Sequence, residues 1–179
     1  SNTQISNTQG DCVYIYGGDC AFVHCTIAQF YPFTATRGNA LFLANNINDQ
    51  YRELRQAQFI NCVITGYGED VIMGSISEGQ DYTCPYLFSH CYLNTVASED
   101  TVRFSHIIYD TDEQPLCREK NFVLFDTDNF LYDFTPDSLS TIRSLADTTY
   151  SRLLPLDLRG KSRVEDDAPD AGCYEYVAP

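Results

Sequence analysis

The segment Phe22-Val23-His24-Cys25-Thr26-Ile27 decides the fold, because closely similar hexapeptides recur along the chain. The pattern apolar–x–(His or Asn)–Cys–x–apolar is found again as FINCVI in residues 59–64 and as FSHCYL in residues 88–93. A looser copy, FSHIIY, occupies residues 104–109. One structural element that is used several times is typical of a solenoid. Chance recurrence in a chain rich in aromatic residues is the alternative.

The pattern of the repeat also predicts the backbone conformation of each copy. Side chains two residues apart on a strand share a face, so Phe22 and Cys25 would face opposite ways on a straight strand. Both can point inward if the chain bends at the residue between them. The candidate bend residues are His24, Asn61, His90 and His106. Asn and His are among the few non-glycine residues enriched at positive φ, so each repeat should be a strand, a one-residue left-handed bend and a second strand.

Further strand-like stretches lie in residues 12–16, 40–44 and 71–73, and turns rich in Gly or Asn bound them. Short strands and tight turns predict an all-β chain. Stacked repeats of this kind form a parallel β-helix, here of about five rungs. Equivalent residues should then form ladders, one of aromatic and one of mainly Cys side chains. The predicted ladders are Phe22, Phe59, Phe88 and Phe104, and Cys25, Cys62, Cys91 and Ile107.

The composition limits the partners. The chain has 179 residues and a formal net charge of −14, with a pI near 4.3. Nucleic-acid binding depends on Lys and Arg that neutralise phosphates, so we expect no nucleic-acid partner. Acidic polysaccharides would be repelled unless a divalent cation bridged them. No apolar run approaches the length of a membrane span, so we expect no transmembrane segment.

The cysteines are predicted to have a structural role. Cys25, Cys62 and Cys91 fall on an inward ladder, where Cys behaves as a small buried apolar residue, so we expect free thiols there. Cys12 and Cys20 would be able to form a disulfide in an exported protein. The chain begins without Met or a visible signal peptide. We therefore expect a piece of a longer polypeptide whose targeting segment has been removed.

The repeat fades near residue 129, so residues 1–128 are predicted to hold the β-helix repeats and residues 129–179 a C-terminal cap segment of the same domain. Thr135-Pro136-Asp137 predicts the start of a short helix that reaches about residue 145. Thr135 would be its N-cap and Pro136 its first helical residue.

The end of the chain resembles a known family. Asp157-Leu158-Arg159-Gly160-Lys161-Ser162-Arg163, followed by Asp170-Ala171-Gly172-Cys173-Tyr174-Glu175, is similar to the closing segment of bacterial surface proteins of the choice-of-anchor Q type. Ala171 and Cys173 depart from the Ile and Ala of the family pattern. The resemblance implies a right-handed parallel β-helix of the pectin-lyase-like superfamily, common in gut Bacteroidetes. It also implies an extracytoplasmic location: cell-surface, attached to the outer membrane, or secreted.

This motif is best explained as a cap over the last rung, whose unpaired backbone groups would otherwise be exposed. Gly172 would allow close approach of the backbone, and Tyr174 would close over the core. Arg163 would pair with an acidic neighbour. The residues assigned to the cap are Asp157, Gly160, Arg163, Asp170, Gly172, Tyr174 and Glu175.

Candidate ligand-binding residues are the acidic groups near the repeat and the Arg beside it: Glu69, Asp70, Asp110, Asp112 and Arg103. Asp126, Asp128 and Asp133 have the spacing of a loose calcium loop, but they lack the glycine and the final glutamate of an EF-hand. Solvated loop charges are the alternative for all of them. We expect no cofactor, with calcium as the alternative. The three His residues are explained better as bend residues than as a metal or catalytic ladder, and residues 46–56 predict a surface loop on which a binding surface could form.

Three functions are compatible with the sequence. The first is a non-catalytic module of an exported, cell-surface protein, which binds a polysaccharide or other glycan or presents a face to it. The second is a fragment of a polysaccharide lyase or glycoside hydrolase, although no catalytic residue can be assigned. The third is a structural spacer or adhesin stalk. An aromatic-lined groove would favour binding, clustered carboxylates beside an Arg would favour the enzyme, and a featureless exterior would favour the spacer.

Overall fold

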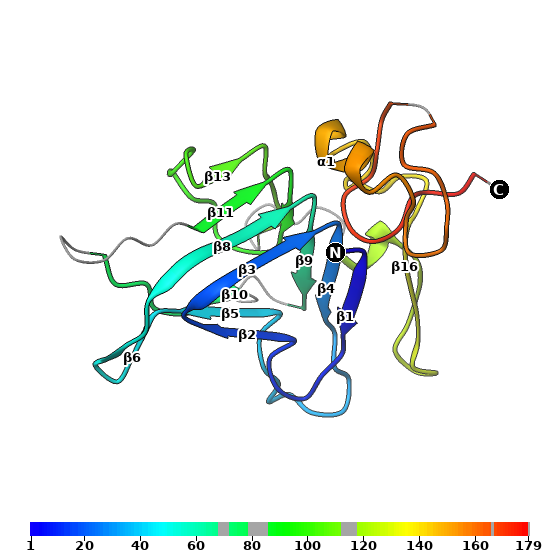
Figure 1. Ribbon diagram of the computed structural model, residues 1–179. Coiled ribbons are helices and arrows are strands. Elements are labelled where there is room, and N and C mark those ends of the chain that lie inside the picture. The colour runs from blue at the N-terminus through cyan, green and yellow to red at the C-terminus, as the bar shows by residue number, and fades with distance from the viewer. Residues whose placement is uncertain (68–71, 79–85, 112–117, 166, 179) are drawn as a thin grey trace.

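The computed structural model describes residues 1–67, 72–78, 86–111, 118–165 and 167–178 (Figure 1). Strands dominate this part of the chain, and its only α-helix is α1 (Thr148–Leu153). The prediction of an all-β protein is therefore confirmed. No helix among these residues is long and apolar enough to cross a membrane.

Most strands belong to three sheets in which every pairing is parallel. The first sheet contains β1 (Thr3–Ser6), β4 (Cys25–Gln29), β9 (Val63–Gly66), β12 (Tyr92–Leu93) and β14 (Ile108–Tyr109). The second contains β2 (Val13–Tyr16), β5 (Leu41–Ala44) and β10 (Ile72–Met73). The third contains β3 (Gly18–Val23), β8 (Leu54–Ile60), β11 (Tyr86–Ser89) and β13 (Phe104–Ser105). From β1 to β11 the chain visits the three sheets three times in the same order, whereas the described residues between β12 and β13 contribute no strand to the second sheet.

The predicted left-handed bends are present where the chain passes from the third sheet to the first. His24, Asn61, His90 and His106 have φ values of 50°, 55°, 52° and 54°. Each bend reverses which side of the chain points inward. Consequently the apolar residues before and after it pack in one core, as the sequence pattern predicts.

The predicted aromatic ladder is also present. Phe22 pairs with Phe59, Phe59 with Phe88, and Phe88 with Phe104. Successive ring centroids lie 5.1, 4.7 and 5.1 Å apart, and the ring planes are within 8° of parallel. These separations are close to the spacing of neighbouring strands, so the rings stack because the strands are in register.

The central strands of the first sheet, β4, β9 and β12, are buried on both faces. Cys25 and Ile27 of β4 point into the core between the sheets, whereas Ala28 packs on the other side, against a second core. In the same way, Ile64 and Val63 of β9 divide between the two cores. Burial on both faces is usual for parallel strands, and here the second layer is supplied by the C-terminal part of the chain.

The cysteines of the described residues are free thiols: Cys12, Cys20, Cys25, Cys62, Cys91 and Cys173. The Cys62 and Cys91 thiols donate to the carbonyls of Ile60 and Phe59, each at 3.3 Å. Burial raises the pKa of the Cys62 thiol well above its ordinary value. The ladder cysteines therefore act as small core residues.

Two antiparallel hairpins project from this framework. The first joins β6 (Asn46–Ile47) to β7 (Gln50–Tyr51), within the polar stretch predicted as a surface loop. The second joins β15 (Phe122–Asp126) to β16 (Leu131–Pro136) and follows a short 3₁₀ helix at Arg118–Asn121. The boundary predicted at residue 128 falls inside the second hairpin.

The helix predicted for residues 135–145 is wrong. Thr135 belongs to β16, and its N–H and hydroxyl both donate to Asp133 Oδ1, at 3.0 and 2.6 Å. The helix lies further along the chain instead, where the Asp147 side chain accepts from the N–H of Thr149 at 2.6 Å and acts as N-cap. The pairing of β16 with β15 thus decides the structure of this segment, although Thr135 and Pro136 are typical of a helix start.

The C-terminal segment does not lie where the sequence analysis places it. Instead of covering the last rung, it packs against the outer face of the first sheet, beside β1, β4 and β9 (Figure 1). Gly172 N–H donates to the Asn61 carbonyl at 2.8 Å, and Cys173 N–H donates to Thr26 Oγ1 at 3.1 Å. The segment therefore works as a lateral layer of the core.

Candidate functional site

An open groove of about 900 Å³ lies between the segment that follows β4 and the hairpin β15–β16. We call it the aromatic groove. Its lining residues are Tyr31, Pro32, Thr34, Ala35, Arg37, Tyr67, Glu119, Phe125, Thr127, Asp128 and Phe130. They come from four separate parts of the chain, so the groove exists only in the folded protein.

The floor of the groove is built on a buried ring. Phe30 is fully buried and meets Tyr67 and Phe125 edge to face, with centroids 5.1 and 4.7 Å apart. The Arg37 guanidinium lies over the Tyr67 ring, 4.5 Å from its centroid. Burial raises the pKa of Tyr67, an effect that Arg37 opposes. The floor of the groove is thus a set of aromatic rings packed on one another.

An exposed aromatic pair forms the rim of the groove: Phe130 lines the groove, and Phe33 packs on Phe130 just outside the lining. Phe33 is 62% exposed and Phe130 is 53% exposed, and their ring centroids lie 4.7 Å apart with the planes tilted by 34°. Tyr31 meets Phe33 edge to face at 5.2 Å. Large aromatic side chains that remain in water beside a groove are typical of a binding surface.

A buried polar cluster holds Tyr67 in place from below. Arg118 Nη1 donates to the Tyr67 carbonyl at 2.8 Å, and its Nε lies 3.4 Å from Asp110 Oδ1. Asp110 is fully buried and also accepts from the Tyr92 hydroxyl. Burial and the adjacent Asp110 carboxylate raise the pKa of Tyr92. This cluster joins the groove to the outer face of β12.

The predicted ligand-binding set is not brought together. Asp110 is enclosed, and its carboxylate is bonded to Tyr92 and Arg118 rather than presented on an outer face. Arg103 lies elsewhere, where it pairs with Glu78 and Asp100 and stacks over Tyr86. Glu69, Asp70 and Asp112 lie outside the described residues.

The predicted calcium ligands do not converge. Asp126 accepts from the N–H groups of Asp128 and Asn129 at 3.1 and 3.0 Å and so closes the hairpin turn. Asp133 pairs instead with Arg159 at 3.0 Å. Burial raises the pKa of Asp133, but hydrogen bonds from Thr135 and Arg159 outweigh it and lower the pKa. In the described ranges, no group of three or more His, Cys, Asp or Glu is arranged to hold a metal ion.

The residues assigned to the cap form a buried polar network. Arg163 is fully buried, pairs with Glu175, and donates to Asn2 Oδ1 at 3.0 Å and to the Gly172 carbonyl at 3.2 Å. Asp157 Oδ2 accepts from the Glu175 N–H at 2.9 Å. The Tyr174 hydroxyl donates to Gln4 Oε1 at 2.9 Å. Through Arg163 and Tyr174 the network is thus bonded to Asn2 and Gln4, at the N-terminal strand β1 and its flank.

Gly160 and Gly172 of the same motif both have positive φ, 86° and 91°. A Cβ on Gly172 would lie 2.6 Å from Thr26 Oγ1, whereas one on Gly160 would meet nothing within 4 Å. Gly172 is therefore required for close approach to β4, rather than for a cap over the last rung, and Gly160 only for its turn.

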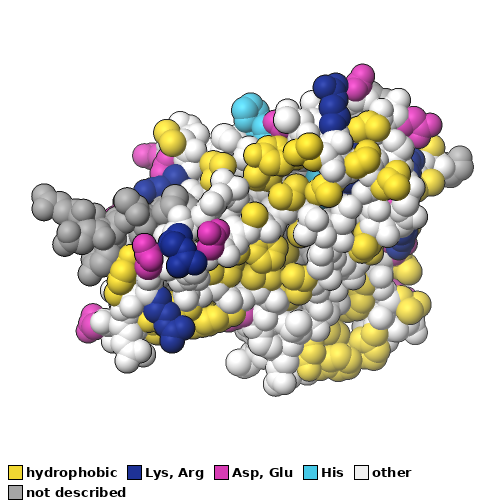
Figure 2. All heavy atoms as spheres, in the orientation of Figure 1, with side chains coloured by type: hydrophobic (Ala, Val, Ile, Leu, Met, Phe, Trp, Pro, Cys, Tyr) yellow, Lys and Arg dark blue, Asp and Glu magenta, His cyan; other side chains and the backbone are white. Residues whose placement is uncertain are grey.

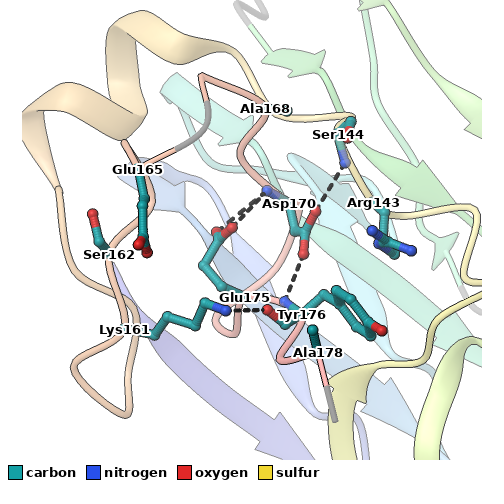
Figure 3. Close-up of a pocket in the computed structure, with 10 residues that line it drawn as sticks. All are labelled: Arg143, Ser144, Lys161, Ser162, Glu165, Ala168, Asp170, Glu175, Tyr176 and Ala178. Carbon is teal, nitrogen blue, oxygen red and sulfur yellow. Dashed lines mark hydrogen bonds between the residues drawn. The ribbon is translucent and has the colours of Figure 1, made fainter.

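A second cavity, of about 400 Å³, opens beside the network (Figure 3). Asp170 lies between Ser144 and Tyr176 and accepts from their N–H groups at 2.9 and 2.7 Å. Burial and the neighbouring Asp170 raise the pKa of Glu175 to about 7, and Arg163 opposes this shift. Asp170 and Glu175 are thus engaged within the protein, which makes this cavity a weaker site than the aromatic groove.

The bend histidines differ in their surroundings. His24 is fully buried, with Nδ1 3.3 Å from the Gly172 carbonyl and Nε2 3.0 Å from Ser151 Oγ. Burial, followed by the charge of Arg163, lowers the pKa of His24 to about 3. His90 and His106 stack on each other with centroids 4.3 Å apart. The three side chains do not share one site.

Charges on the visible face of the molecule are dispersed. In Figure 2, Lys and Arg side chains lie close to Asp and Glu side chains, and apolar patches separate these groups. Apolar side chains gather toward the lower right, where Figure 1 draws the turn that leads into β16.

The aromatic groove is not among the sites predicted from the sequence. Its signal was present as two dense aromatic stretches, Phe30-Tyr31-Pro32-Phe33 and Phe122 to Phe134. The sequence alone does not indicate that these two stretches lie side by side in the folded protein.

Comparison with protein-family models, with curated proteins and with solved structures finds no match to this chain.

Proposed function

We propose that the three parallel sheets are the faces of a right-handed parallel β-helix. The proposal is supported by the repeated order in which the chain visits the sheets and by the in-register ladder from Phe22 to Phe104. Right-handed crossovers are the rule for parallel strands. The C-terminal motif adds its resemblance to exported, cell-surface proteins of the choice-of-anchor Q type, and with it we propose an extracytoplasmic location.

We propose that the chain is a non-catalytic module that binds a neutral polysaccharide or other neutral glycan in the aromatic groove. The observation that carries this proposal is the exposed aromatic rim of Phe33 and Phe130 above a floor of Tyr67 and Phe125. A pyranose ring has an apolar face of C–H bonds that packs on an aromatic ring, while its hydroxyl groups need polar partners. Thr34, Thr127, Glu119 and Asp128 line the same groove and offer oxygen atoms for them.

The charge of the groove favours a neutral ligand. Glu119 and Asp128 line it, and its cation, Arg37, lies against the Tyr67 ring. The whole chain carries a net charge of −14. An acidic polysaccharide would meet unfavourable electrostatics at both the local and the global level, whereas hydroxyl groups donate readily to carboxylates.

Affinity electrophoresis through gels that contain neutral or acidic polysaccharides tests this function. The wild-type protein should be retarded by at least one neutral polysaccharide and not by polygalacturonate. Tyr31→Ala should abolish the retardation, and Tyr14→Ala, which removes an exposed aromatic ring on β2 outside the groove, should preserve it. Equal mobility of the wild-type protein in every gel would contradict the proposal.

A glycoside hydrolase is the second candidate, and one observation favours it: Glu119 and Asp128 line the same groove as Arg37. Hydrolases of glycosides use a pair of carboxyl groups as acid and base or nucleophile. Incubation with the same polysaccharides, with and without calcium, followed by mass spectrometry separates the two functions. Released oligosaccharides that disappear in Glu119→Gln would establish the enzyme, and intact polysaccharide would favour the binding module.

A further inference from the structure

Two bulky residues at the aromatic groove, Arg118 and Phe130, have an unfavourable backbone conformation with positive φ. In the described part of the chain, the non-glycine residues with positive φ are Asn, Asp, His and Ser, with the exceptions of Arg118 at 35° and Phe130 at 57°. Arg118 donates to the Tyr67 carbonyl beneath the groove, and Phe130 lines the groove itself. A positive φ is unfavourable for a bulky side chain, and such strain is concentrated at functional sites.

The hairpin turn itself does not require phenylalanine. Asp126 closes the turn by accepting from the N–H groups of Asp128 and Asn129, and Phe130 follows as the left-handed residue before β16. Gly or Asn would adopt this conformation with less strain. An aromatic side chain therefore stands at a position where local backbone energetics favour a small residue.

Core packing does not explain the aromatic side chain either. Phe125, Tyr132 and Phe134 of the same hairpin pack in the second core, but Phe130 does not belong to that core, and 53% of it is exposed. Its aromatic neighbour is Phe33, which is also exposed. The two rings pack against each other with their planes tilted by 34°, and they form one exposed apolar patch to which two different segments contribute.

We infer that Phe130 is a ligand-contacting residue of the groove, which with Phe33 receives the C–H face of a neutral pyranose ring, and that its strained backbone is retained for this contact. The inference rests on the proposed function and adds the residue that selects flat, neutral sugar rings. An axial substituent on the packed face would lift the sugar ring from this aromatic patch, so the glycan should present an unobstructed face at this position.

The test compares two substitutions at residue 130 that distinguish the effect of backbone strain from the effect of the aromatic side chain. Phe130→Asn removes the ring and relieves the backbone, whereas Phe130→Tyr keeps both the ring and the strain. Melting temperatures are measured for each protein, together with affinities for the hexasaccharides of β-linked glucose, mannose and xylose. Phe130→Asn should melt no lower than wild type and bind about tenfold more weakly or worse, and Phe130→Tyr should bind as wild type does.

Two results would overturn the inference alone. A clear drop in the melting temperature of Phe130→Asn would mean that the ring is kept for packing. Unchanged affinity in Phe130→Asn would mean that the ring does not touch the glycan, while the binding function stands. If the wild-type protein binds none of the three hexasaccharides and no neutral polysaccharide, the proposed function fails and this inference fails with it.

Discussion

The side chain of Asn61 bonds to both backbone groups of Asp147: its Oδ1 accepts from the Asp147 N–H at 2.8 Å, and its Nδ2 donates to the Asp147 carbonyl at 3.1 Å. Asn61 is a left-handed bend residue of the repeat, and Asp147 is the N-cap of α1. The bend therefore has two roles, since it turns the chain between sheets and also docks the C-terminal layer. His24, one repeat earlier, approaches Ser151 of the same helix.

Asn61→Gly separates these two roles, because glycine keeps the left-handed backbone and loses the side-chain bonds. We expect the free energy of unfolding to fall by about 1–3 kcal/mol, since buried polar groups are left without partners. Asn48→Gly is the matched control: Asn48 also has positive φ but is exposed in the β6–β7 turn, so its stability should change by less than about 0.5 kcal/mol. Equal effects in urea unfolding would contradict the docking role.

The two motif glycines should respond differently to alanine. Gly172→Ala places a Cβ 2.6 Å from Thr26 Oγ1 on a strained backbone, and we expect a loss of about 2–4 kcal/mol. Gly160→Ala meets open space and should cost only about 1 kcal/mol through its positive φ. Thermal unfolding followed by circular dichroism measures both variants. A Gly172→Ala variant as stable as Gly160→Ala would mean that the segment does not pack tightly on β4.

Arg163→Ala should be among the most destabilising single substitutions, because it leaves Glu175 buried beside Asp170 without its cation. The expected cost is about 3–5 kcal/mol. Arg159→Ala removes a half-exposed partner of Asp133 from the same motif and should cost no more than about 1 kcal/mol. Chemical denaturation at neutral pH compares them. Similar midpoints for the two variants would show that the Arg163 network contributes little.

The buried His24 predicts a dependence of stability on pH. Its pKa is about 3 in the folded protein and 6.5 ordinarily, so below pH 6.5 the unfolded chain takes up a proton that the folded chain excludes. The stability that neutral His24 provides is present above pH 6.5 and is lost as the pH falls toward 3. His24→Asn, which copies the bend residue found at Asn61, removes this loss.

Between pH 7 and pH 5, wild type should lose about 2 kcal/mol more than His24→Asn does. Glu175 acts in the opposite direction: its pKa of about 7 lies above the ordinary 4.5, so its contribution is present at low pH and is lost as the pH rises through 7. Because both proteins contain Glu175, their difference isolates His24. Parallel stability curves for the two proteins would show that His24 titrates normally.

The repeat region could be predicted from the sequence because its constraints are local. Phe22, His24 and Cys25 lie within one hexapeptide, and the parity of their side chains already requires a bend at the histidine. The same parity places Phe59 and Phe88 in register with Phe22, as the structure shows. Each of these inferences needs only one pattern and its recurrence.

The C-terminal layer and the groove could not be predicted in this way, because they depend on contacts between distant residues. Thr135 carries a good helix-start signal, but its pairing partner is β15, which the local sequence does not reveal. Asp110 looks like a loop carboxylate and is in fact buried by Tyr92 and Arg118. The groove joins Tyr31 to Phe130, and no short-range pattern connects them.

The proposal that the aromatic groove binds a neutral glycan is tested most directly by NMR, which maps where a neutral oligosaccharide binds on the wild-type protein. A titration with the β-linked hexasaccharides should shift the amide signals of Tyr31, Phe33, Tyr67 and Phe130 together and leave β2 and the Arg163 network unchanged. Shifts confined to another surface, or no shifts with any neutral glycan, would contradict the assignment of the aromatic groove as a glycan-binding site.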